Sequence, residues 1–269
     1  MFKMHKLAAF AAVAAITLAS CEPTTPVDPN PGDDMTKIIS ENITANETWC
    51  ADTVYQLGGR ITVTAGATLT IQPGTVIKGE AGTGANATAL LIARGAKLMA
   101  EGTASLPIIF TSVADEITHD QLLTGDFKSP NLDATVSGLW GGVIVLGNAK
   151  ISASNASGDV SEVQIEGIPT SDANGLYGGS DDADNSGVIT YVSIRHGGAN
   201  IGSGNEINGL TLGGVGSGTT IENVEVVSNQ DDGIEWFGGT VNVTNVVVWN
   251  AGDDGIDTDQ SWGGTLDNF

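Results

Sequence analysis

Six acidic residues near the end of the chain have the side chains and the spacing of a cation-binding site. The segment VVSNQDDGIEW (226–236) returns in altered form as VVWNAGDDGID (247–257), and each copy carries paired aspartates. Calcium in proteins takes roughly six to eight oxygen ligands from carboxylates, carbonyls and water. The sequence therefore predicts a Ca²⁺ site whose candidate ligands are Asp231, Asp232, Glu235, Asp253, Asp254 and Asp257.

Such a site requires that the two copies lie side by side. They are related by a constant offset of 22 residues, which aligns Asn223 with Asn245 and Asp231 with Asp253. A repeat of that length matches one coil of a parallel β-helix, in which each coil hydrogen-bonds to the next. The alternation of residues 221–226 predicts a strand with one inward and one outward face. We therefore expect an all-β fold, a right-handed parallel β-helix (a solenoid) in which Asn223 stacks on Asn245.

The rest of the chain follows the same pattern with more variable turns. TVTAGATLT (62–70) resembles LIARGAKLM (91–99) at an offset of 29 residues. Because residues 263–266 begin another copy and no capping element follows them, we expect either that the solenoid continues beyond Phe269 or that a partner covers its end. Further strands are predicted at 107–112, 142–146, 163–167, 188–194 and 210–212, and loops that leave the stack at 115–134 and 177–187.

The amino-terminal residues predict export and a membrane anchor. Residues 1–20 contain two lysines and then an apolar run, which is too short to cross a bilayer and is typical of a secretory signal peptide. The run ends in Leu-Ala-Ser-Cys at 18–21, which resembles the lipobox of bacterial lipoproteins. The resemblance implies cleavage before Cys21 and acylation of its sulfur, which would attach the protein to a membrane; the alternative interpretation is a chance cysteine near a soluble-secretion cleavage site. Residues 21–40 predict a flexible tether, and residues 41–269 predict one β-helix domain.

The charge of the chain restricts its partners. The chain has 32 acidic and 10 basic side chains, and loss of residues 1–20, which hold two of the lysines and no acid, changes the formal net charge from −22 to −24. Nucleic acid and anionic lipid are therefore poor partners, whereas cations, neutral sugars and basic proteins suit this surface. With Cys21 acylated, Cys50 would be the only remaining cysteine, so no disulfide within the mature chain is expected.

Four stretches of the chain resemble a family of secreted β-helix lipoproteins common in Bacteroidota. They are GLWGGVIVLGNAKI (138–151), GVITYVSIRHGG (187–198), 205–226 and 231–260. The resemblance covers about residues 45–269 and implies the fold and an outer-membrane or cell-surface location. It implies no particular activity.

A second resemblance concerns the aspartates. Asp253-Asp254-Gly255-Ile256-Asp257 resembles the motif of calcium-dependent pectate lyases, which implies a Ca²⁺ held by neighbouring coils against an acidic sugar. Those enzymes also use a basic side chain to remove a proton from the sugar. No Lys or Arg follows Arg195, so the chain departs from that pattern and we assign no catalytic residue.

Three tryptophans flank the acidic turns. Trp249 precedes the second turn, and Trp236 and Trp262 follow the first and second turns. Because aromatic rings stack on sugar rings, the three residues predict a glycan-binding platform beside the carboxylates; packing in the core is the alternative.

The aspartates also have a second interpretation, in which their side chains cap the amides of their own turns and point into solvent. We expect a lipid-anchored protein of the cell envelope that binds surface glycan or Ca²⁺ without catalysis. The alternatives are a calcium-dependent polysaccharide lyase and a purely structural surface spacer.

Overall fold

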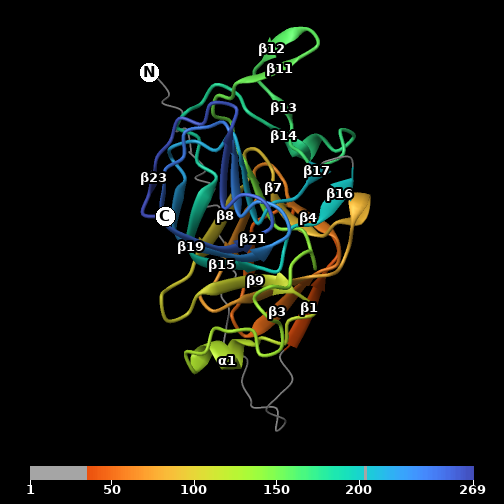
Figure 1. Cartoon of the computed structure of the whole chain (residues 1–269), viewed down its shortest axis with the longest axis vertical. Helices are drawn as coiled ribbons and strands as arrows, with labels where there is room; N and C mark the ends of the chain where they lie inside the picture. Colours follow the sequence, from red (N-terminus) through yellow and green to blue (C-terminus); the bar gives the residue numbers. More distant parts are fainter. Residues whose placement is uncertain (1–34, 203–204) are drawn as a thin grey trace, which may run out of the picture.

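The structure is a computed structural model of the 269-residue chain and describes residues 35–202 and 205–269. Short strands of successive coils run side by side, and loops and hairpins project from the stack at several places (Figure 1). The predicted signal peptide, Cys21 and the tether up to residue 34 lie outside the described residues.

Eleven strands form the larger of the two main sheets. They are β1 (Met35–Ile39), β2 (Glu47–Trp49), β3 (Thr53–Leu57), β5 (Thr68–Ile71), β6 (Val76–Gly79), β8 (Lys97–Glu101), β9 (Ile108–Ser112), β15 (Gly187–Arg195), β19 (Thr220–Asn229), β21 (Val243–Ala251) and β23 (Leu266–Asp267). One line of strands has the order β1-β3-β6-β9-β15-β19-β21-β23, and a second line, β2-β5-β8, joins it at β15. Every pairing in this sheet is parallel.

Six strands form the other main sheet. They are β4 (Arg60–Val63), β7 (Ala89–Ile92), β10 (Val143–Leu146), β18 (Leu210–Gly213), β20 (Ile234–Phe237) and β22 (Ile256–Asp259). Their order is β22-β20-β18-β10-β7-β4, and all pairs are parallel. Parallel strands that stack in chain order in two sheets define a parallel β-helix.

The remaining elements lie outside these two sheets. Three antiparallel hairpins are made by β11 (Ala153–Asn155) with β12 (Gly158–Val160), β13 (Val163–Gln164) with β14 (Leu176–Tyr177), and β16 (Asn200–Gly202) with β17 (Asn205–Glu206). There is one short α-helix, α1 (His119–Leu123), within the described residues, and there are 3₁₀ turns at Gly84–Asn86 and Ala173–Gly175. No helix of the described chain is long and apolar enough to cross a membrane.

Each long strand of the larger sheet changes direction at a left-handed residue in its first half or middle, which gives the coil a third side. Tyr191, Asn223 and Asn245 have left-handed backbone angles (φ 49°, 54° and 57°) within β15, β19 and β21. As a result β15 pairs with β8 before its bend and with β9 after it. Asparagine tolerates the left-handed region better than most residues, and its amide also links the coils here. Asn245 Nδ2 donates to Asn223 Oδ1 at 3.2 Å, and Asn268 Nδ2 donates to Asn245 Oδ1 at 2.7 Å.

The pairing register confirms the repeats read from the sequence. Ile234 lies beside Ile256, an offset of 22 residues, and Leu69 lies beside Leu98, an offset of 29. The stack of Asn223 on Asn245 is also confirmed, and Asn268 extends it. Four of the further predicted strands correspond to β9, β10, β15 and β18. The strand predicted at 163–167 is shorter and belongs to a hairpin, because β13 pairs with β14 instead of joining the stack.

Inward side chains of successive coils form one continuous core. Apolar residues alternate with outward ones along the strands, and rows such as Phe110, Ile194 and Val226 are fully buried. Fully burying a side chain of this kind stabilises the fold by roughly 1.5–3 kcal/mol. Each added coil therefore stabilises its neighbour by continuing the same rows.

The structure corrects two expectations for the amino-terminal part. Residues 35–39 were expected in the tether, but they form β1, which pairs with β3 along its whole length and is part of the stack. Cys50 is half-buried and disulfide-bonded. The expected absence of a disulfide applies to a mature chain with acylated Cys21, and it does not hold for the full 269-residue chain of this structure.

Polar contacts fasten the two large excursions to the coils. In the loop after β9, the buried Asp115 accepts hydrogen bonds from the Ile117 amide and from the hydroxyls of Thr111 and Ser129. The excursion that carries β11 to β14 is tied down by ion pairs Arg60–Asp172 and Arg94–Glu162, at 3.3 and 2.7 Å. Both loops thus have fixed positions beside the stack.

Candidate metal centre

The two acidic turns lie directly on one another. The Asp254 amide donates to Asp232 Oδ1 at 2.8 Å, and the Gly252 amide donates to the Asp231 carbonyl at 3.2 Å. The turns connect β19 to β20 and β21 to β22, and their coils are in register on both sides. The juxtaposition predicted from the offset of 22 residues is therefore confirmed.

Five of the six predicted ligands form two overlapping groups. Asp231, Asp232 and Asp253 form the outer group, and Asp232, Glu235 and Asp257 form the inner group. Within each group the ligand oxygens lie within 4.8 Å of one another. The sixth candidate, Asp254, belongs to neither group: its side chain is exposed, and it contributes its backbone amide to Asp232.

The inner group is held by the outward face of the six-stranded sheet. Glu235 of β20 and Asp257 of β22 are direct neighbours in the ladder. Asn208, two residues before β18, donates from Nδ2 to Glu235 Oε2 at 2.5 Å. Although it faces outward, Glu235 is only 9% exposed. Burial raises the pKa of Glu235 to about 8, and the carboxylates of Asp232 and Asp257 add to the effect, against the bond from Asn208.

The outer group is more exposed to solvent than the inner group, and its carboxylates also repel one another. Burial raises the pKa of Asp231 to about 6, with further contributions from Asp232 and Asp253. The pKa of Asp232 is raised as well, chiefly by burial, although the bond from the Asp254 amide opposes the shift. Like-charged carboxylates this close repel one another, and a bound cation would remove that cost.

Two further carboxylates complete the cluster, and sequence reasoning missed both. Glu166 follows β13 and Glu206 lies in β17, and the Glu206 amide donates to Glu166 Oε1 at 3.2 Å. Burial, then the Glu206 carboxylate and Asp232, raise the pKa of Glu166. Both residues also act on the pKa of Asp231. They come from hairpins outside the repeat, so no periodic signal in the sequence could have aligned them with the aspartates.

One buried oxygen beside the inner group has no partner. Asn208 is 4% exposed, and its Oδ1 makes no hydrogen bond within the described chain, although its Nδ2 binds Glu235. Buried polar atoms are almost always paired, so such an orphan oxygen needs an explanation. An amide oxygen is also an ordinary ligand of Ca²⁺. The residues present therefore fit a hard cation that would bind the inner carboxylates and Asn208 Oδ1.

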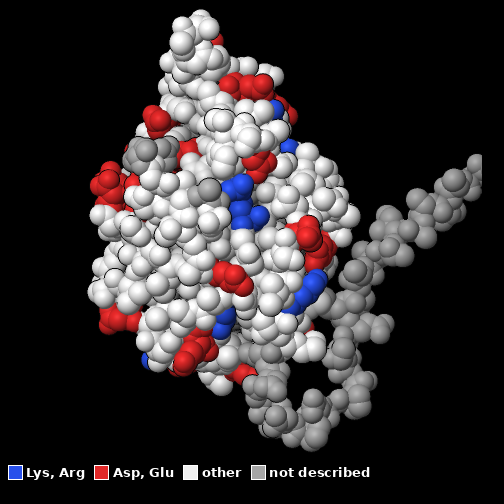
Figure 2. Space-filling view, turned by 90° about the vertical axis from the view of Figure 1, so that its right-hand side faces the viewer, with Lys and Arg blue, Asp and Glu red and all other residues white. Residues whose placement is uncertain are grey.

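No basic side chain neutralises this cluster in the described chain. None of its ion pairs involves a carboxylate of the two groups. Arg195, the only Lys or Arg after residue 150, pairs instead with Glu225 on the larger sheet at 3.0 Å. On the face shown in Figure 2, acidic patches are spread over the surface and several basic patches lie among them, one near the centre.

The tryptophans do not form the predicted platform. Trp236 is completely buried and stacks on Trp262 at a ring distance of 4.8 Å, inside the end of the core. Trp249 lies on the outer face of β21 and is 60% exposed. The reason is the two-residue period of a strand: Glu235 faces outward, so its neighbour Trp236 must face inward. The three rings thus offer no common surface to a sugar.

The fold and the acidic turns define a parallel β-helix with a carboxylate cluster at the edge of its smaller sheet. A family model described as a pectate-lyase-like β-helix domain matches residues 41–125 and 127–269, and the chain belongs to this family. No curated protein and no solved structure matches the chain.

Proposed function

We propose that the protein binds Ca²⁺ through Asp232, Glu235 and Asp257 and uses the bound ion to hold surface glycan, without catalysis. The observation that carries the proposal is the buried, unpartnered Oδ1 of Asn208 beside these three carboxylates. Acidic clusters are common on protein surfaces, but an orphan buried oxygen on a side chain that contacts one points to a missing ligand.

The donor set favours a hard cation such as calcium over metals that prefer nitrogen or sulfur ligands. Both groups consist only of carboxylates, whereas zinc and other transition metals favour imidazole or thiolate. The inner carboxylates and Asn208 would supply four of the roughly six to eight oxygens that Ca²⁺ takes. The remaining positions suit water or the hydroxyl and carboxylate oxygens of a sugar, which is how the ion would link the protein to glycan.

Lyase chemistry is not part of the proposal, because no ion pair of the described chain brings a Lys or Arg to the carboxylates of the two groups. The Arg195 guanidinium donates to Ser193, to the Phe127 carbonyl and to Glu225, on the outer face of the larger sheet. It is thus engaged away from Glu235 and Asp257, which face outward from the smaller sheet. With polygalacturonate and Ca²⁺ we expect binding but no unsaturated product.

We also propose that lipid on Cys21 holds the protein at the outer membrane or the cell surface. The support is the signal-like residues 1–20 and the Leu-Ala-Ser-Cys sequence that ends at Cys21. An envelope location is consistent with a strongly acidic protein whose proposed ligand is a surface glycan.

Calcium titration by calorimetry tests the metal proposal. The wild-type chain should release or absorb heat, and Asp257→Asn should weaken binding by roughly tenfold or more, because ligand charge sets calcium affinity. Asp254→Asn is the matched control: it removes the same charge three residues earlier, in the turn before β22, but its carboxylate belongs to neither group. Equal affinities for the Asp257 and Asp254 variants would contradict the site.

A second experiment, with polygalacturonate, distinguishes glycan binding from a purely structural spacer role. Polygalacturonate should raise the melting temperature of the wild type only when Ca²⁺ is present, and EDTA should abolish the effect. If neither Ca²⁺ nor polygalacturonate changes the melting temperature, the protein is a structural spacer and the proposed function fails.

A further inference from the structure

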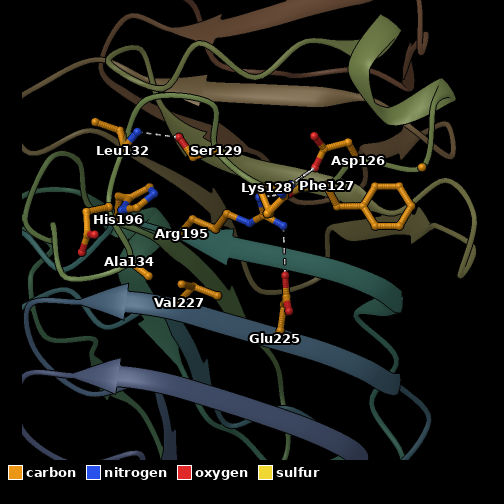
Figure 3. Close-up of a pocket in the computed structure, with 12 residues that line it drawn as sticks. Asp126, Phe127, Lys128, Ser129, Leu132, Ala134, Arg195, His196, Glu225 and Val227 are labelled. Carbon is orange, nitrogen blue, oxygen red and sulfur yellow. Dashed lines mark hydrogen bonds and ion pairs between the residues drawn. The ribbon is translucent and has the colours of Figure 1, made fainter.

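A hollow lies on a different face of the molecule from the acidic cluster. Residues 125–134 of the loop after β9 arch over the outer face of β15 and β19 and enclose a cavity of about 660 Å³. This volume lies within the range of small-ligand sites. Arg195 reaches into the hollow between the loop residues and Glu225 (Figure 3).

Arg195 is the fixed centre of this hollow. Its side chain is 8% exposed, and its three nitrogens donate to Ser193 Oγ at 2.6 Å, to the Phe127 carbonyl at 2.5 Å and to Glu225 Oε1 at 3.0 Å. The Ser193 hydroxyl also donates to Glu225 Oε1. Glu225 Oε2 makes no hydrogen bond within the described chain, and Glu225 lines the cavity. The pair therefore presents a preorganised acceptor to a ligand.

The charges of the hollow largely cancel. Glu225 neutralises Arg195, and Lys128 Nζ lies 3.9 Å from Asp126 Oδ1. Asp133 is the one other acidic side chain in the lining. Because the whole chain is strongly acidic, an anionic ligand would be repelled. The lining suits an uncharged molecule with many hydroxyl groups.

Apolar surface accompanies these polar groups and continues along the sheet. Phe127 and Val227 line the cavity, and Phe127 also borders a neighbouring hollow of about 470 Å³. That hollow extends over Tyr191 and Val247, which are 37% and 57% exposed, to the asparagine ladder of the bends. Aromatic rings beside planar hydrogen-bonding groups are the usual means of recognising the two faces of a sugar ring.

The cavity and the neighbouring hollow together form one groove. We propose that this groove binds an uncharged oligosaccharide without a metal ion. The groove is formed by the larger sheet and its loop, whereas the carboxylate cluster belongs to the turns and the smaller sheet. Sugar hydroxyls would donate to Glu225 Oε2 and accept from Lys128, and a ring face would pack on Phe127. The protein would then have two glycan contacts of different chemistry, one through Ca²⁺ and one through these side chains.

Binding in EDTA tests the groove. A panel of uncharged di- to hexasaccharides is screened against the wild-type chain, and the best binder is titrated by calorimetry. Phe127→Ala should weaken its affinity by about tenfold, since an aromatic contact is worth on the order of 1 kcal/mol or more. Leu123→Ala is the control: this residue lies in α1 of the same loop, is 59% exposed and does not line the cavity. Absence of any binder, or equal affinities for wild type and Phe127→Ala, would overturn the proposal.

Hydrogen exchange measured on the wild-type chain tests the sugar site without the Phe127→Ala variant, so its result does not depend on whether that variant folds. The bound sugar should slow amide exchange in residues 125–134, and slowing confined to residues 231–257 would overturn the assignment. Because these measurements contain no metal, their failure leaves calcium binding at Asp257 untouched, and failure of calcium binding leaves the groove untouched.

Discussion

Glu235 shows how strongly position in the stack changes a single side chain. Its ordinary pKa of 4.5 applies to the unfolded chain, whereas burial raises it to about 8 in the folded chain. Between these two pH values the folded chain keeps a proton that the unfolded chain has released. The free energy of unfolding therefore falls as the pH rises through this window.

Glu235→Gln should remove this dependence, because glutamine resembles the protonated form at every pH. In EDTA, the variant should melt at a higher temperature than the wild type at pH 9 and at nearly the same temperature at pH 4. Scanning calorimetry from pH 4 to pH 9 measures both. Asp231, whose pKa is about 6, contributes mainly at lower pH, so the interval from pH 6 to pH 8 is diagnostic. Parallel curves for the two proteins over that interval would refute the burial of an ionisable Glu235.

The inward orientation of Trp236 could have been predicted from the sequence. The sequence Ile234-Glu235-Trp236 already alternates apolar and acidic side chains, and in a strand this places Trp236 beside Ile234 in the core. This period favours the alternative of core packing over the platform, and the structure bears that alternative out for Trp236. The signal that decides between the two interpretations was therefore present in three consecutive residues.

At the scale of elements, the asparagine ladder is the device that holds the bends in register. Asn245 combines a left-handed backbone with hydrogen bonds to Asn223 and Asn268. Asn245→Ala should lower the free energy of unfolding by about 1–2 kcal/mol, since alanine tolerates this conformation poorly and the amide bonds are lost. Urea denaturation measures the change.

Asn245→Gly is the matched variant for this prediction. Glycine adopts the left-handed conformation freely but has no amide, so its cost should be smaller than that of alanine and should report the ladder bonds alone. A wild-type stability for both variants would show that the bends are fixed by the core and not by Asn245.

The elements also divide into those that the sequence could predict and those that it could not. The coils around residues 221–257 repeat without a gap, so their register and the contact between the two aspartate turns followed from counting. Glu166, Glu206 and Asn208 were not predictable in this way. They lie in or after hairpins whose lengths vary, and their positions depend on how those hairpins fold back onto the coils.

At the scale of the whole molecule, the net charge determines what kind of membrane anchor the protein would need. A chain with so many carboxylates is repelled from anionic lipid, so a covalent lipid would be needed to keep it at a membrane. The chain has two cysteines, Cys21 and Cys50. A sulfur that carries lipid cannot also form a disulfide, so lipid on Cys21 and a disulfide between these two residues exclude each other.

Mass spectrometry of the protein purified from membranes decides between these states. We expect a mature chain that begins at Cys21 and is heavier by a diacylglyceryl group, and Cys21→Ser should be released from the membrane fraction. An unmodified Cys21 linked to Cys50 would contradict the anchor. Neither result bears on calcium or sugar binding, because both proposed sites lie within residues 125–257.

The register between the two aspartate turns affects how such a protein can evolve by duplication of its coils. Since each coil contacts only its immediate neighbours, duplication of one 22-residue unit would insert a further coil with its acids already aligned. The row of stacked acidic turns would grow by one step while the rest of the scaffold kept its shape. The proposed capacity for divalent ions would then increase by duplication alone, without a change of fold.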